Sequence, residues 1–179
     1  MGETALMWKV FPKKHTKIGK KIMFDEQHEL VGVQDATIDG KGRLAIPAKF
    51  RDALSSFDSP VLYTTLKTRS HLLLYPEPAW RSFMDNELPK MQGSSVLRGV
   101  GKLMQNNVEK LTPDASWRVL IPPRLRELLN FNEKDVVVAG SSNRLEVWSK
   151  VEWDRQTATV LDIPDIDLET ALAESGVRI

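Results

Sequence analysis

The chain has 179 residues, a formal net charge of +1 and no cysteine. That length accommodates one domain or two small ones, and the missing thiols exclude disulfides and thiol chemistry, which indicates an intracellular protein. No apolar run reaches the roughly 20 residues of a membrane helix. Because the net charge is close to zero, a nucleic-acid-binding surface would have to come from segregated charge.

The two ends of the chain carry opposite charge. Residues 1–22 include the basic run KKHTKIGKK, at residues 13–21, which is either an electrostatic arm or a solvated tail. The charged side chains of residues 162–175 are all acidic. We expect a basic extension over residues 1–22 and a mobile, solubilising acidic tail over residues 156–179.

A first structural unit is expected over residues 23–80. Its elements should be a strand, a short strand, a helix and a hairpin, at residues 30–38, 43–46, 48–56 and 61–80. Pro47 ends the short strand and suits a helix start, where a missing N–H costs nothing. The four-residue spacing of Phe50 and Leu54 predicts that both lie on one face of the helix.

A helical link follows over residues 81–106. Pro89 breaks it, and the helix beyond carries apolar side chains at helical spacing, which we interpret as core packing. These side chains are Leu97, Val100, Met104 and Val108.

The second unit, over residues 107–155, repeats the first. Its strand, short strand, helix and hairpin are expected at residues 107–112, 118–121, 123–130 and 136–153. Leu125 and Leu129 have the same four-residue spacing and are expected on one face of this helix. The sequence TIDGKGRLAIPAKFRDAL of the first unit aligns with TPDASWRVLIPPRLRELL of the second. The aligned identities are Thr37 with Thr112, Asp39 with Asp114, Arg43 with Arg118, Ile46 with Ile121, Pro47 with Pro122, Arg51 with Arg126, and Leu54 with Leu129.

A repeat that occurs only twice indicates a duplicated module. One unit has too few strands to bury its own faces, whereas two can pair strands about a pseudo-twofold axis and share a core. We therefore predict a mixed α+β, strand-rich fold of two βαββ-type modules. Both Asp-to-Arg turns would then fall on one face.

The Asp-x-x-x-Arg turn has the chemistry of an anion or base contact. In DGKGR, Asp39 can accept hydrogen bonds from turn amides or hold the guanidinium of Arg43, and Lys41 projects from the tip. The rest of the Arg43 fork could then meet phosphate or a guanine edge. One isolated motif would favour a simple Asp-capped turn with a surface ion pair. The second copy, Asp114 to Arg118, shifts the interpretation toward function.

The second turn differs, because Trp117 replaces Gly42. A tight turn with positive φ is harder without glycine, which predicts a weaker DNA role for Arg118. Trp117 would either stack on a base or, the favoured alternative, pack within the protein or an interface. Further phosphate contacts are predicted at four basic residues: Lys49, Arg51, Arg124 and Arg126.

These motifs, together with Met23-Phe24, LLLYPEPAW and LEVWSKVEW, resemble those of the MraZ family of bacterial transcriptional regulators, in the same order through to about Trp153. The resemblance implies two AbrB-like swapped-hairpin modules per chain, a closed homo-oligomeric ring, and a cytoplasmic, nucleoid-associated protein. It also implies binding of double-stranded DNA at repeated promoter sites of the division and cell-wall gene cluster. The implied DNA-binding residues are Asp39, Arg43, Asp114 and Arg118.

The sequence also bears on two other classes of function. The acidic tail would suit a protein-interaction or antitoxin-like module on the same fold. Catalysis is disfavoured, because His15, His28 and His71 have neither metal-ligand spacing nor a nucleophile partner. Asp39 and Asp114 would each be held ionised by an arginine and so make a poor acid–base pair. No cofactor, metal site or membrane partner is expected.

Overall fold

The computed structural model describes residues 30–131 and 134–177. The predicted basic extension, the start of the first unit, His15 and His28 lie outside the described residues. Along the chain the elements are β1 Leu30–Thr37, β2 Arg43–Ala45, α1 Ala48–Ser55, β3 Leu62–Thr65, β4 His71–Pro76, α2 Glu77–Ser82, the π-helix η2 Phe83–Glu87, the 3₁₀-helix η3 Leu88–Gly93, α3 Ser95–Asn106, β5 Glu109–Leu111, β6 Arg118–Leu120, α4 Pro123–Leu128, β7 Asp135–Ser142, β8 Leu145–Ser149, α5 Lys150–Leu161 and α6 Asp165–Ser175.

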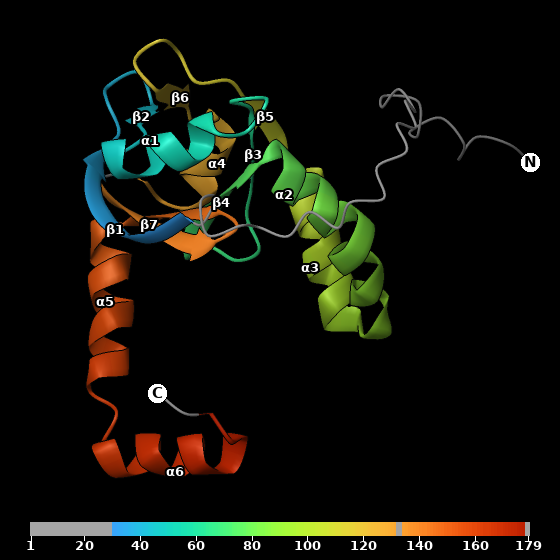
Figure 1. Cartoon of the computed structure of the whole chain (residues 1–179), viewed down its shortest axis with the longest axis vertical. Helices are drawn as coiled ribbons and strands as arrows, with labels where there is room; N and C mark the ends of the chain where they lie inside the picture. The colour runs from blue at the N-terminus through green and yellow to red at the C-terminus, as the bar shows by residue number, and fades with distance from the viewer. Residues whose placement is uncertain (1–29, 132–133, 178–179) are drawn as a thin grey trace, which may run out of the picture.

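Most of the described strands form one antiparallel sheet in the order β1-β7-β8-β4-β3-β5 (Figure 1). The first strand of each unit pairs with a hairpin strand of the other unit: β1 pairs with β7, and β5 pairs with β3. The two hairpins meet in the middle through β4 and β8. This mixed α+β, strand-rich architecture confirms the predicted fold class.

The two short strands form a separate ribbon. β2 pairs antiparallel with β6, with Leu44 opposite Val119 at the centre. The ribbon is extended at both ends, because Ile46 N–H donates to the carbonyl of Trp117 at 2.8 Å and Ile121 N–H donates to that of Gly42 at 2.9 Å. Each unit's turn is therefore tied to the strand of the other unit.

The main core lies between the sheet, the ribbon and helices α1 and α4. Leu44 and Val119 point into it from the ribbon and are fully buried. The predicted apolar faces of the two helices are confirmed, since Phe50 and Leu54 of α1 and Leu125 of α4 are buried in the same cluster. The units thus share one core, as the duplicated sequence requires.

A second cluster joins the sheet to the helical link. Trp80 of α2 stacks on Tyr63 with ring centroids 5.8 Å apart, and Met104 of α3 is buried beside them. The predicted stripe on α3 packs as expected at Met104, with Val100 and Val108 partly buried. Leu97 departs from it and is 45% exposed.

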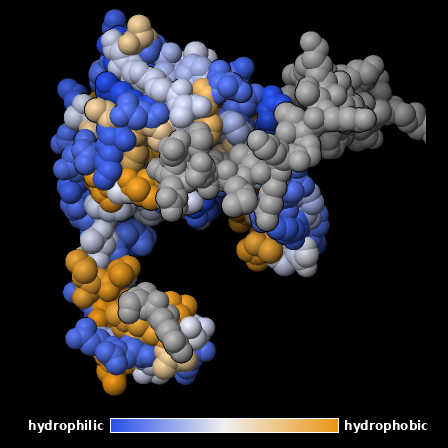
Figure 2. Space-filling view, in the orientation of Figure 1, coloured by the Kyte–Doolittle hydropathy of each residue, from blue (hydrophilic) through white to orange (hydrophobic). Residues whose placement is uncertain are grey.

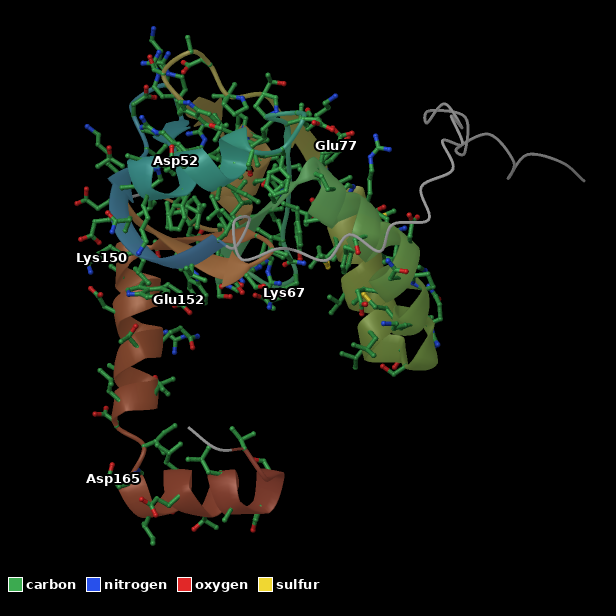
Figure 3. The ribbon with its side chains drawn as sticks, viewed as in Figure 1. Asp52, Lys67, Glu77, Lys150, Glu152 and Asp165 are labelled. Atoms are coloured by element: carbon green, nitrogen blue, oxygen red, sulfur yellow. The ribbon has the colours of Figure 1, made fainter. Side chains whose placement is uncertain are left out.

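The C-terminal helices project from the body. α5 leaves the sheet at Lys150 and Glu152, and α6 begins near Asp165, well away from the sheet (Figure 3). The acidic end was expected as a tail, but it forms a helix with no buried residue. Most of its apolar side chains are solvent-exposed, with Ile166 at 72%, and apolar groups gather on the lower part of this arm beside hydrophilic ones (Figure 2).

Among the described residues, no helix combines the length and apolarity needed to cross a membrane.

Candidate nucleic-acid interface

The first Asp-to-Arg turn is closed by a single carboxylate. Oδ1 of Asp39 accepts the backbone N–H groups of Lys41 and Arg43, each at 2.9 Å. Oδ2 accepts Nε of Arg43 at 2.8 Å and lies 2.8 Å from its Nη2. Asp39 therefore both caps the turn and fixes the direction of the guanidinium, which leaves the far edge of the fork toward solvent.

The second turn repeats this geometry. Oδ1 of Asp114 accepts the N–H groups of Ser116 and Arg118 at 2.9 and 3.0 Å, and Oδ2 lies 2.9 Å from Nε and 2.8 Å from Nη2 of Arg118. Trp117 adopts φ +58°, where Gly42 has +81°. The irregular second turn predicted from the missing glycine is therefore wrong: the side chain of Trp117 packs against the main core, which offsets the cost of a left-handed residue.

The arginines hold both carboxylates ionised. Hydrogen bonds from the backbone and then the side chain of Arg43 lower the pKa of Asp39 from 3.8 to about 2. At Asp114 the pKa is also lowered, first by the side chain of Arg118 and then by its backbone N–H. Neither carboxyl is suited to carry a proton near neutrality, so an Asp39–Asp114 acid–base pair is not supported.

Arg43 and Arg118 lie on the same face of the ribbon. Side chains alternate along a strand, and Leu44 and Val119 are buried between them and their neighbours. Register places Arg43 opposite Leu120 and Arg118 opposite Ala45, so these four side chains share the outer face. The two arginines are offset by two residues along the ribbon, or about 7 Å. Both Asp-to-Arg turns were expected to fall on one face, and the register agrees with this for the side chains of Arg43 and Arg118.

The second unit also contributes to the first turn. The guanidinium of Arg126 lies against Gly42, where an added Cβ would be 2.7 Å from its central carbon. Nε of Arg126 donates to the carbonyl of Ile121 at 3.2 Å, as Nε of Arg51 donates to that of Ile46 at 2.8 Å. Both arginines are half-buried, so they support the ribbon and keep only their terminal nitrogens for an anion.

The remaining predicted basic residues are placed differently. Lys41 is exposed at the tip of the first turn, and Arg124 is exposed on α4. Lys49 is exposed too, but its ammonium lies against Gly32 in the first half of β1. Since Asp39 follows the other end of β1, the structure does not bring Lys49 to the first turn.

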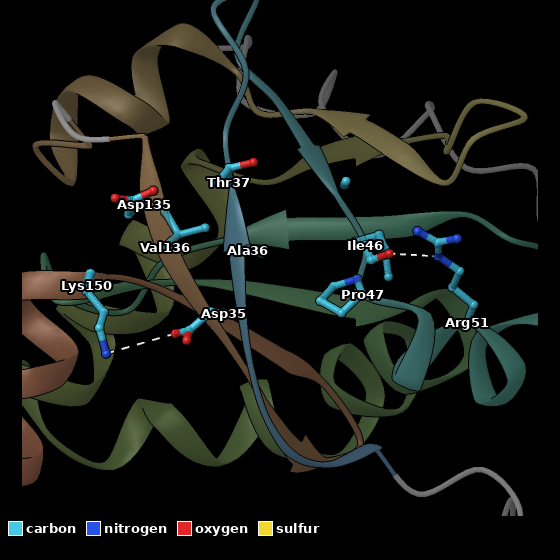
Figure 4. Close-up of a pocket in the computed structure, with 10 residues that line it drawn as sticks. Asp35, Ala36, Thr37, Ile46, Pro47, Arg51, Asp135, Val136 and Lys150 are labelled. Atoms are coloured by element: carbon cyan, nitrogen blue, oxygen red, sulfur yellow. Dashed lines mark hydrogen bonds and ion pairs between the residues drawn. The ribbon is translucent and has the colours of Figure 1, made fainter.

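A hollow of about 580 Å³ lies beside the end of β2, between β1 and the start of α1 (Figure 4). Its lining includes Arg51 and Lys150, but also the carboxylates of Asp35 and Asp135. Lys150 lies 3.9 Å from Asp35. The mixed charge makes this hollow a poor site for phosphate, so the solvent face of the ribbon is the better candidate surface.

Comparison with known proteins assigns the chain to a family. The family model described as "MraZ protein, putative antitoxin-like" matches residues 30–97 and 104–174. The chain belongs to the MraZ family. Proteins named transcriptional regulator MraZ are 44% identical over 80% of this chain and 96% of the relative in Chromobacterium violaceum, and 37% identical over 88% of this chain and 100% of the relative in Neisseria gonorrhoeae. One from Legionella pneumophila is 39% identical over 69% of this chain and 81% of the relative.

Within this MraZ-family chain, the described residues contain no group of three His, Asp or Glu side chains placed to hold a metal ion.

Sequence reasoning missed two features of the ribbon. Arg126 was predicted only as a phosphate contact, whereas the fold brings its guanidinium against Gly42 of the first turn. Sequence reasoning also gave no role to Leu120, which is 53% exposed beside Arg43. The alternation in RVLI, with valine inward and leucine outward, was the available signal for Leu120.

Proposed function

We propose that this chain is a DNA-binding transcriptional regulator that contacts double-stranded DNA through the outer face of the β2–β6 ribbon. The relatives named above are transcriptional regulators, and none of those names describes an enzyme. The proposal rests above all on one observation: two arginines, each oriented by its own aspartate, lie on the same ribbon face.

A two-stranded ribbon fits the major groove of B-DNA, and an arginine fork is the commonest partner of the guanine edge there. Arg43 and Arg118 would contact bases or phosphates, and Asp39 and Asp114 would orient them. Lys41, Arg124 and the terminal nitrogens of Arg126 would add phosphate contacts nearby. Arg51 would contribute less because its Nε is bonded to the carbonyl of Ile46. Lys49 would contribute less because its ammonium lies against Gly32, in the half of β1 away from the first turn.

We further propose that residues 23–80 and 107–155 are two AbrB-like swapped-hairpin modules related by a pseudo-twofold axis, with residues 81–106 as their link. The reciprocal strand pairings β1–β7 and β5–β3 support this arrangement. So do the matched bonds of Ile46 and Ile121 to the opposite turns.

We also propose that the chain assembles into a homo-oligomeric ring. The α5–α6 arm exposes apolar side chains, including Leu161 at 78% and Ile166 at 72%, that the other described residues do not cover. A ring would present several ribbons to successive repeats in a promoter and so gain avidity without new contacts. The regulated promoter would be that of the division and cell-wall gene cluster, in a cytoplasmic, nucleoid-associated protein of a bacterium.

A second candidate function is a protein-interaction or antitoxin-like role. The exposed, acidic α6 favours it, as does the description of the family model. A pull-down that compares the full chain with a chain ending at residue 161 distinguishes the two functions. The second candidate predicts that the shortened chain loses a bound protein other than the chain itself. An unchanged set of bound proteins would exclude it.

The proposed function is tested by a gel shift of the purified chain on the promoter of its own gene cluster. A duplex of equal length and composition with the repeats scrambled serves as the control. We expect at least a 10³-fold preference for the promoter, as specific binding usually exceeds non-specific binding by that much. Equal affinity for both duplexes would refute the proposal.

A further inference from the structure

The outer face of the ribbon is chemically asymmetric. Arg43 and Arg118 occupy equivalent positions in the two units, but their cross-strand neighbours differ: Leu120 lies opposite Arg43 and Ala45 lies opposite Arg118. Leu120 is 53% exposed, while the shorter Ala45 is half-buried. The repeat therefore places a large apolar side chain directly opposite Arg43, and only a small one directly opposite Arg118.

A single exposed leucine on a protein surface requires no explanation. Leu120 is distinctive because of where the register puts it. Residues directly opposite in an antiparallel pair have Cβ atoms about 4.5–5.5 Å apart, and Arg43 is held in one direction by Asp39. Leu120 thus lies directly opposite an arginine whose orientation is also fixed.

When Arg43 approaches a base edge, Leu120 is close enough to reach a base one or two steps away, since stacked bases are about 3.4 Å apart along a strand. In the major groove, the apolar group that a base pair presents is the C5-methyl of thymine. A leucine at that edge leaves polar atoms unpaired at other bases and gains only at thymine.

We propose that Leu120 is a specificity-determining residue that contacts the C5-methyl of a thymine within two base pairs of the guanine bound by Arg43. This inference rests on the proposed function and deepens it. Because Ala45 does not supply the same contact beside Arg118, the two turns of one chain would select different bases, and the bound site would be asymmetric within each pair of turns.

The test uses the full chain and a duplex recovered by its own selection from random-sequence DNA. Each thymine in the recovered site is replaced in turn by deoxyuridine, which removes the methyl and changes no hydrogen bond. For the unaltered chain we expect one replacement to weaken binding about three- to fivefold, the worth of one methyl group returned to water. For Leu120→Ala, that replacement should change nothing, while Leu120→Met should keep most of the sensitivity.

The matched control is Val151→Ala, which truncates an apolar side chain 62% exposed on α5, away from the ribbon. It should retain the thymine sensitivity in full. Unchanged sensitivity in Leu120→Ala, no sensitive thymine in the unaltered chain, or a changed oligomer mass in Leu120→Ala would each overturn the inference alone. Failure of selection to enrich any duplex would refute the proposed function as well.

Discussion

The carboxylate of Asp39 holds Arg43 through one oxygen, Oδ2, which lies 2.8 Å from both Nε and Nη2. The other oxygen is occupied by two backbone N–H groups of the turn. The side chain of Asp39 therefore both caps the turn and orients the guanidinium of Arg43. Asp114 and Arg118 repeat the arrangement.

The pKa values of Asp39 and Asp114 are both lowered, but by different main causes. Since the folded-state pKa of Asp39 is lowered from 3.8 to about 2, the ion pair should be complete above pH 4 and be lost as the pH falls toward 2. Arg43→Ala should raise the pKa of Asp39 only in part, because the backbone N–H of residue 43, the largest cause, remains.

At Asp114 the side chain of Arg118 is the largest cause of the lowered pKa, so Arg118→Ala should bring the pKa of Asp114 closer to its usual value. Carboxyl chemical shifts followed by NMR between pH 2 and 6 measure both groups. A midpoint of Asp39 near 4 in the unaltered chain would contradict the geometry described here.

Gly42→Ala should destabilise the first turn. Gly42 has φ +81°, and a Cβ there would be 2.7 Å from the guanidinium carbon of Arg126. The left-handed backbone alone costs roughly 1–2 kcal/mol for a residue with a side chain, and Arg126 must also move. Urea unfolding measures the loss. Gly40→Ala is the matched control, because Gly40 lies in the same turn with nothing within 4 Å of an added Cβ; a loss equal to that of Gly42→Ala would count against the account.

Oligomer mass should depend on the apolar face of α6. Ile166 is 72% exposed, so Ile166→Asp should leave the folding of the single chain intact. The added charge should lower the oligomer mass measured by light scattering. Glu169→Gln, on the same helix, should leave the mass unchanged. An unaltered mass in Ile166→Asp would remove the support that α6 gives to ring assembly.

Stability should fall in mild acid because of His71. This side chain stacks on Trp148 with centroids 4.0 Å apart, and burial lowers its pKa from 6.5 to about 4, against the opposing charge of Glu146. Below pH 6.5 His71 is protonated in the unfolded chain but stays neutral in the folded chain, so the free energy of unfolding decreases as the pH falls toward 4.

The expected loss from His71 is about 2 kcal/mol between pH 7 and pH 5. Urea unfolding at the two pH values should show it in the unaltered chain. His71→Phe, which keeps an aromatic ring on Trp148 without the titration, should show a smaller loss; an equal loss in both chains would exclude His71 as the cause.

Much of this fold was predictable because the two units have visibly similar sequences. The spacing of Phe50 and Leu54, and of Leu125 and Leu129, fixed the buried helix faces, and all of them are buried. Alternation within a strand, however, does not say which strand lies beside it. The reciprocal pairing of β1 with β7 and of β5 with β3 depends on contacts across the whole chain, which local patterns do not encode.

Local rules failed at two places for identifiable reasons. At Trp117, a residue disfavoured at positive φ adopts φ +58°, because its ring packs on the main core and tertiary packing outweighs the local cost. At α6, a segment rich in acidic residues forms a helix on which no residue is buried. The apolar residues spaced through it, such as Ile166 and Leu168, were the overlooked sign.

The central claim is tested most directly by the DNA affinity of Arg43→Ala and Arg118→Ala. Each should weaken binding to the repeat-containing promoter by about 5- to 150-fold, with oligomer mass and unfolding midpoint nearly unchanged. The irregular turn that would have made Arg118 the lesser contact is absent, so the two losses should be comparable. Arg155→Ala, whose ion pair with Glu152 lies on α5, should bind normally. Promoter affinity equal to that of the unaltered chain in both turn variants would contradict the account.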